Sequence, residues 1–133
     1  MEQDIEVQGW LQKALESLAT AASEVANGRY NSAANRCYYA CFQAAIVALL
    51  QAGIRTTNPC GEWGHDFVQA EFAKLIRRQK AYPSELAGEL TRLFALRRRA
   101  DYQPAQVSHS QVERALARTR RFVETIEKGG VRQ

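Results

Sequence analysis

The stretch from about Asn31 to Ala52 has the period of a helix but almost no polar face. Small or apolar residues recur on nearly every side of it: Ala33, Cys37, Tyr38, Ala40, Cys41, Ala44, Ile46 and Leu49. A helix without a polar face has to be covered by other elements, so it belongs in the middle of a helical bundle. This segment therefore predicts a central helix with other helices packed around it.

Four further segments have helical period. They run from about Asp4 to Ala26, from His65 to Arg78, from Pro83 to Asp101, and from Ser110 to Gly129-Gly130. Pro83 suits the first turn of its helix, and Ser110-Gln-Val-Glu113 fits a capping box. No segment has the alternation of a strand. The sequence therefore predicts one all-α domain over residues 1–133, an up-and-down bundle of four main helices plus one short helix.

The sequence lacks the features of membrane and metal proteins. No apolar stretch approaches the roughly 20 residues that span a bilayer, and the acidic start Glu2-Gln3-Asp4 is unlike the basic beginning of a signal peptide. We therefore expect a cytoplasmic protein with no membrane partner. Cys37 and Cys41 have no further Cys or His at metal-ligand spacing. We interpret them as small core residues, and we expect no metal and no cofactor.

Basic residues are concentrated in the second half of the chain. Residues 1–71 carry four Lys or Arg against eight acidic residues, whereas residues 72–133 carry fourteen against six. Of the 18 basic residues fourteen are arginines, whose planar guanidinium fork matches phosphate oxygens in a bidentate way. This half is either a phosphate-binding surface or a solvated basic one.

One arginine interrupts an apolar stripe in the helix predicted over 83–101. The stripe consists of Leu86, Leu90 and Leu93, and its next two steps are Arg97 and Asp101. This spacing places the arginine and the aspartate on the core face, within pairing distance of each other. A charge on such a face is costly unless it is paired or faces a cleft. Two interpretations follow: an ion pair that locks the bundle, or a polar cleft at a subunit interface where the arginine meets a phosphate.

Other polar candidates lie near the start of the central helix. Asn35 and Tyr39 are four residues apart and share a face, whereas Arg36 and Tyr38 point in other directions. A tyrosine in a bundle is usually a core residue whose hydroxyl is bound to a neighbour. The alternative is that Asn35 or Tyr39 faces the same cleft as the arginine on the core stripe.

Two histidines and a basic stripe complete the candidates. His65 opens the short helix, where it is either a structural hydrogen-bonding residue or a catalyst, and His109 lies in the connection before the last helix, where we expect it to be exposed. Arg114, Arg118 and Arg121 form a stripe on the last helix. That stripe is either a solvated face or a nucleic-acid contact.

Four motifs, taken in order, resemble those of HEPN domains. They are Gly28-Arg-Tyr30, then Ala33 with Tyr38-Tyr39-Ala40-Cys-Phe42, then Gly64-His65, then Arg97-Arg-Arg-Ala100-Asp101-Tyr102. The resemblance is to small stand-alone prokaryotic members with a YYA helix and an R-x-x-A-D-Y ending, and it covers about Ala14 to Ile126. It implies a homodimer with a two-fold interface and a working cleft between the protomers. It also implies a minimal nucleotidyltransferase as partner in a toxin–antitoxin-like system.

Many HEPN proteins are metal-independent ribonucleases, and the resemblance extends to their signature only in part. That signature is an arginine, four to six residues, and a histidine: the arginine positions the phosphate, and the histidine assists attack by the ribose 2′-hydroxyl. Here four residues after Arg97 are followed by Tyr102 in place of a histidine. Because a tyrosine hydroxyl titrates near pH ~10, it is a poor general base at neutral pH. His65 is the candidate for an imidazole supplied from another helix.

Three functional hypotheses follow, and whether the protein is an enzyme stays open. The first is a binding module that holds RNA or a nucleotide in a basic dimer cleft through Arg97 and Arg36. In it Asp101 and Tyr102 orient Arg97, and Asn35 and Tyr39 are further binding residues. The second is a ribonuclease toxin with an altered site, in which the catalytic candidates are Arg97, Tyr102 and His65. The third is a structural scaffold in which Arg97 and Asp101 staple the bundle.

Overall fold

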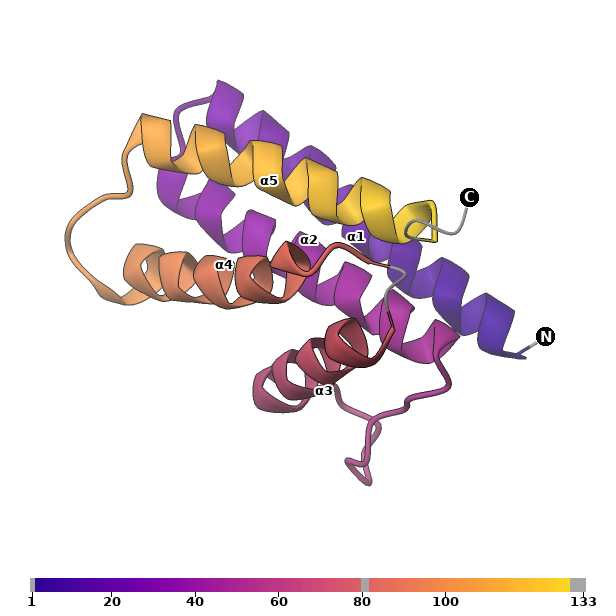
Figure 1. Ribbon diagram of the computed structural model, residues 1–133. Coiled ribbons are helices and arrows are strands. Elements are labelled where there is room, and N and C mark those ends of the chain that lie inside the picture. The colour runs from indigo at the N-terminus through magenta and orange to yellow at the C-terminus, as the bar shows by residue number, and fades with distance from the viewer. Residues whose placement is uncertain (1, 80–81, 130–133) are drawn as a thin grey trace.

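The computed structural model describes residues 2–79 and 82–129, and within these ranges it contains five α-helices and no strand (Figure 1). The helices are α1 (Glu2–Ala26), α2 (Tyr30–Gln51), α3 (His65–Arg78), α4 (Glu85–Tyr102) and α5 (His109–Glu127). The prediction of an all-α bundle with four main helices and one short helix is confirmed, and α3 is the short one, with 14 residues. Gly130, part of the predicted end of the last helix, lies outside the described residues.

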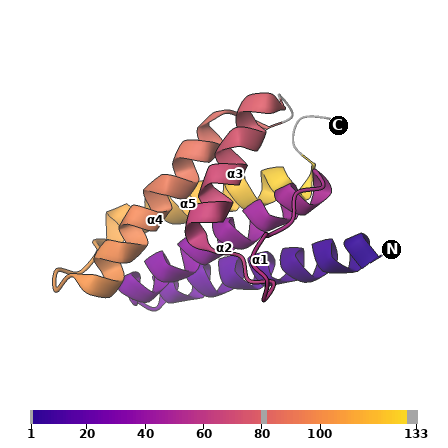
Figure 2. The same cartoon turned by 90° about the horizontal axis from the view of Figure 1, so that it is seen from below.

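Helix α2 lies at the centre of the bundle, as its apolar sequence predicts. It contacts all four other helices, and Figure 2 shows α1 and α3 on opposite sides of it. The run 44–50 is at most 1% exposed. Ala14 and Ala21 of α1 are also fully buried. Small side chains therefore line the contact between α1 and α2 and let these two helices approach closely. Ser17 adds a hydrogen bond to the side-chain amide of Gln43, at 2.8 Å.

The start of α5 differs from the predicted one. Its capping box is Ser108 with Gln111, not the box predicted over 110–113: the Ser108 hydroxyl accepts from the Gln111 amide (3.1 Å), and Gln111 Oε1 accepts from the Ser108 amide (3.0 Å). Both serines fit the motif. The earlier one follows the buried Val107, whose amide donates to Asn31 Oδ1 at 3.0 Å. This tertiary anchor holds the chain where α5 begins.

Helix α4, in contrast, begins later than predicted. Pro83 lies before the helix, which starts at Glu85. The leucine stripe is as expected, because Leu86, Leu90 and Leu93 are at most 2% exposed. The apolar side of α4 therefore packs on the core. This packing also positions Arg97 and Asp101, which continue the same stripe.

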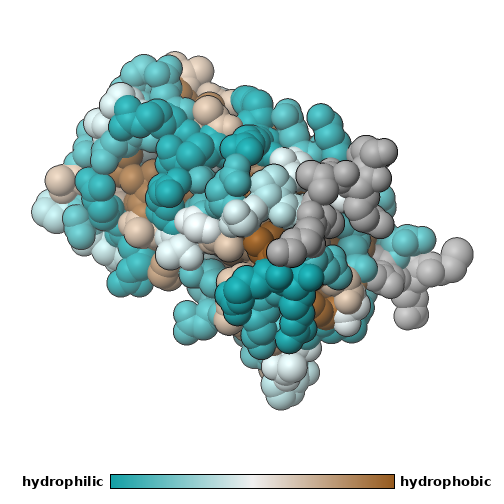
Figure 3. All heavy atoms as spheres, viewed as in Figure 1, coloured by the Kyte–Doolittle hydropathy of each residue, from teal (hydrophilic) through white to brown (hydrophobic). Residues whose placement is uncertain are grey.

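The surface and the cysteines follow the sequence pattern. Hydrophilic side chains cover most of the face seen in Figure 3. Cys37 and Cys41 are free and fully buried, whereas Cys60 is exposed. Burial raises the pKa of Cys37 to about 11 and holds the pKa of Cys41 well above its usual value, so both remain protonated thiols. Within the described ranges, no helix is both long and apolar enough to cross a bilayer.

Candidate functional site

Arg97 continues the leucine stripe of α4 but ends among aromatic rings. Its side chain is 13% exposed, and its Nε donates to Asp101 Oδ2 at 3.1 Å. Its guanidinium carbon lies 5.5–5.9 Å from the ring centroids of Tyr38, Tyr39 and Phe94, within the range of cation–π attraction. Among the described residues, none hydrogen-bonds its two terminal nitrogens. The guanidinium is thus held through its Nε, while its two terminal nitrogens form no hydrogen bond with any described residue.

A short polar chain from α2 holds Asp101. Asn35 Nδ2 donates to Asp101 Oδ2 at 3.1 Å, and Asn35 Oδ1 accepts from Nε and Nη2 of Arg36 at 3.1 and 2.8 Å. The structure therefore brings Asn35 to the arginine of α4, as one of the two interpretations requires. Arg36 was expected to point in another direction. That expectation is wrong, because its long side chain folds back over the Tyr39 ring, 5.1 Å from the centroid.

His65, the first residue of α3, lies beside the same rings. Its ring centroid is 5.1–6.0 Å from those of four aromatic residues: Tyr38, Tyr39, Phe42 and Phe94. Its Nδ1 lies 2.7 Å from the Tyr38 hydroxyl. Three of these rings also contact Arg97, so the imidazole and the guanidinium share one environment. We call this set the Arg97 cluster: Asn35, Arg36, Tyr38, Tyr39, Phe42, His65, Phe94, Arg97 and Asp101.

The environment of His65 favours its neutral form. Burial lowers its pKa, the positive charge of Arg97 lowers it further, and Asp66 opposes both effects. At pH ~7 the imidazole is therefore uncharged. Burial also raises the pKa of Tyr38 to about 12, so its hydroxyl keeps its proton. This hydroxyl can donate to Nδ1, which puts the imidazole proton on Nε2, or accept from Nδ1–H, which leaves Nε2 with a free lone pair.

Tyr102 lies outside the Arg97 cluster. It is 67% exposed, and the guanidinium of Arg98 lies 5.3 Å from its ring centroid. Five residues along an α-helix amount to a turn of about 140° beyond a full circle, so Tyr102 projects from another side of α4 than Arg97. Of the three catalytic candidates, the structure brings Arg97 and His65 together and leaves Tyr102 apart.

Three members of the cluster were not singled out as site residues from sequence: Tyr38, which was expected to point in another direction, Phe42 and Phe94. Phe94 lies three residues before Arg97, so the i,i+3 rule for helices would have found it. Phe42 lies four residues after Tyr38, and the same rule applies. Among the residues that the structure describes, no three His, Cys, Asp or Glu side chains gather as metal ligands would.

Two comparisons with known proteins relate the sequence of this chain to others. The model of the HEPN domain matches residues 7–129, a range that contains every member of the Arg97 cluster. The chain is also 28% identical over 123 residues to a UPF0332 protein of Thermotoga maritima, an alignment that covers 92% of this chain and 89% of that protein.

Proposed function

Because the chain belongs to the HEPN domain family, we propose that it is a homodimeric module that binds RNA or a nucleotide through the Arg97 cluster. Further parts of the proposal are that it belongs to the stand-alone subgroup with YYA and R-x-x-A-D-Y motifs, that the cluster faces a basic cleft between protomers, and that a minimal nucleotidyltransferase is its partner in a toxin–antitoxin-like system. The observation that carries the proposal is the guanidinium of Arg97, whose two terminal nitrogens form no hydrogen bond with any described residue.

The contacts of Arg97 suit a ligand better than a staple. A guanidinium that only locks a bundle gains most from a bidentate pair with a carboxylate. Here Nε alone meets Asp101, and the Oδ2 that accepts it also accepts from Asn35. The terminal nitrogens remain for a phosphate, whose oxygens match the fork.

The aromatic members of the cluster supply the second half of a nucleotide site. Tyr39 and Phe94 are partly exposed, and both flank Arg97. Bases stack on such ring faces without regard to sequence. A nucleotide whose phosphate binds Arg97 and whose base stacks on one of these rings would therefore use both the charged and the aromatic side chains of the cluster.

Fluorescence anisotropy with labelled single-stranded RNA tests the proposal. Each charge-assisted hydrogen bond is worth about 1.5–3 kcal/mol, so Arg97→Met should weaken binding about 10- to 100-fold. Arg78→Met is the matched control, because this exposed residue lies at the far end of α3, about 20 Å from His65 along the helix. Equal affinities for the wild type and both variants would refute the role of the cluster. Light scattering tests the dimer separately, because a monomeric mass would rule out a cleft shared between protomers.

A metal-independent ribonuclease is the second candidate, and the neutral His65 beside Arg97 is the observation that favours it. In this reaction Nε2 of His65 takes the proton of a ribose 2′-hydroxyl, and the 2′-oxygen attacks the adjacent phosphorus. A 2′,3′-cyclic phosphate forms, and the 5′-oxygen leaves with a proton from water. Arg97 would stabilise the charge that develops on the phosphoryl oxygens. This chemistry requires the tautomer in which Nδ1–H donates to Tyr38.

Incubation with end-labelled RNA and a chelator separates the two candidates. Cleavage by the wild type that both Arg97→Ala and His65→Asn abolish would establish the ribonuclease. RNA that stays intact while it binds would leave the binding module.

A further inference from the structure

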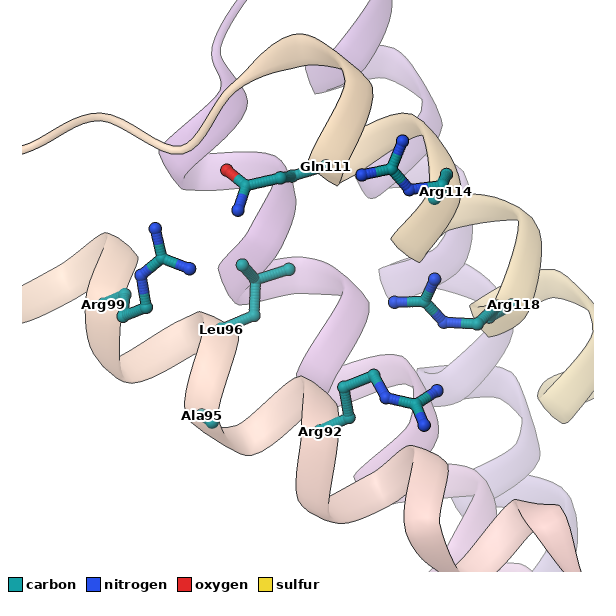
Figure 4. A pocket seen from close by; sticks show the side chains of 7 residues that line it. All are labelled: Arg92, Ala95, Leu96, Arg99, Gln111, Arg114 and Arg118. Atoms are coloured by element: carbon teal, nitrogen blue, oxygen red, sulfur yellow. The ribbon is translucent and has the colours of Figure 1, made fainter.

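A second basic site lies between α4 and α5. A groove of about 340 Å³ separates the two helices there. Figure 4 shows the side chains that line it from both sides, with Leu96 between them: Arg92 and Arg99 from α4, and Gln111, Arg114 and Arg118 from α5. The guanidinium groups of the two helices thus project toward a common space.

Two of the four arginines share one carboxylate, and the other two have no ion-pair partner among the described residues. Glu89, which is 6% exposed, forms ion pairs with Arg92 (2.9 Å) and with Arg118. For Arg99 and Arg114, no carboxylate within the described part of the chain comes within ion-pair distance. The buried carboxylate fixes one end of the groove, and the other end presents two guanidiniums that are available to an anion.

Consecutive arginines connect this groove with the Arg97 cluster. Residues 97, 98 and 99 follow one another on α4, and each step turns about 100° around the helix. Arg97 therefore reaches the cluster with α2 and α3, and Arg99 reaches the groove with α5. Arg98 lies between them, with its guanidinium 5.3 Å from the Tyr102 ring centroid and 6.0 Å from that of Phe94. The outer surface of α4 thus alternates positive charge with ring faces.

We propose that a single strand of RNA crosses α4 along this path, from the Arg97 cluster over Arg98 and Tyr102 into the groove, where Arg99 and Arg114 bind its phosphates. The inference rests on the proposed function for the end of the strand at Arg97. Alternating guanidiniums and rings suit a single strand, whose backbone carries phosphates and whose bases have stacking faces. A helix with its side chains is about 10–12 Å wide, so only a strand of several nucleotides spans both sites.

Binding of RNA of two lengths tests the path. Anisotropy would compare a trinucleotide with a dodecamer, since grooves of this kind cover about 4–16 nucleotides. Arg99→Ala/Arg114→Ala should weaken binding of the dodecamer about 10- to 100-fold. It should also reduce the slope of log affinity against log salt by about 1.4, because each phosphate contact on a single strand contributes about 0.7. The trinucleotide should lose less than about threefold, since distant exposed charges are screened.

Arg77→Ala/Arg78→Ala is the control, because it removes the same charge from exposed residues of α3. Equal losses in the two double variants would mean that net charge alone matters, and would overturn the path. An unchanged dodecamer affinity in Arg99→Ala/Arg114→Ala, or equal losses at both lengths, would overturn it while leaving the proposed function intact. A wild type that binds neither RNA would overturn both. If the alanine variant melts early, Arg99→Gln/Arg114→Gln keeps much of the side-chain length and serves in its place.

Discussion

Replacing Arg97 with methionine separates a binding residue from a structural staple. Methionine keeps an unbranched apolar side chain on the core face of α4 and removes the guanidinium, with its charge and its hydrogen bond to Asp101. The three functional hypotheses differ in what they expect for stability. If Arg97 and Asp101 are a structural staple, the substitution should lower the free energy of unfolding by about 3–5 kcal/mol, because removing one partner of a buried ion pair leaves the other charge uncompensated.

The structure predicts a much smaller effect. The Asp101 side chain, 26% exposed, keeps its hydrogen bond from Asn35 after Arg97 is gone, so its charge is not left uncompensated. Each cation–π interaction that the substitution removes is worth about 0.5–1 kcal/mol. Against this, a charge that is only 13% exposed leaves the protein, and relief of its desolvation offsets a similar amount. We expect the free energy of unfolding to change by less than about 1 kcal/mol, or the melting temperature by less than about 4 °C.

Urea denaturation followed by circular dichroism at neutral pH measures this change. Leu93→Ala, one turn earlier on the same stripe and fully buried, is the positive control and should cost about 2–5 kcal/mol. A loss above about 3 kcal/mol in Arg97→Met would refute the reasoning and support the scaffold hypothesis.

Three further perturbations test the site and the fold. Tyr38→Phe removes the hydrogen bond to His65 and should lower the free energy of unfolding by about 1 kcal/mol; an unchanged denaturation midpoint would mean that the bond contributes nothing. The folded protein lowers the pKa of His65, so the neutral imidazole contributes to the free energy of unfolding above pH ~6.5, where a histidine titrates in the unfolded chain. This contribution is lost as the pH falls below that value and through the pKa of His65 in the folded protein. His65→Asn should therefore flatten the decline of stability in acid, measured by denaturation at several pH values, and a parallel decline would contradict the assigned environment. Ser108→Ala should cost about 1 kcal/mol through loss of the cap, and Ser110→Ala much less; equal losses in thermal melts would argue against the observed start of α5.

The elements that sequence predicts well are those fixed by local pattern. The apolarity of α2 requires a central position wherever its neighbours lie, and the spacing of Arg97 and Asp101 decides their pairing within one helix. The approach of His65 to Arg97 is different, because it depends on how α3 packs against α2 and α4 after a loop whose course no local pattern specifies. No periodicity in the chain contains that information.

Local signals also fail where two choices are equally good. Ser108 and Ser110 both precede a suitable third residue, and the anchor of Val107 on Asn31 selects between them. The position of Arg36 depends on the reach of a long side chain, which helical angles do not describe. The first case is decided by a contact between segments far apart in the chain, and the second by how far a long side chain extends from the backbone.

The burial of Cys37 and Cys41 makes Cys60 a unique chemical handle. The chain has three cysteines, and two of them are fully enclosed protonated thiols that a reagent in water cannot reach. A maleimide dye or spin label should therefore attach to Cys60 alone, in the loop that leads to His65, without any engineered substitution. In a two-fold dimer each protomer would carry one such label, so the distance between two labels would report the geometry of the assembly in solution.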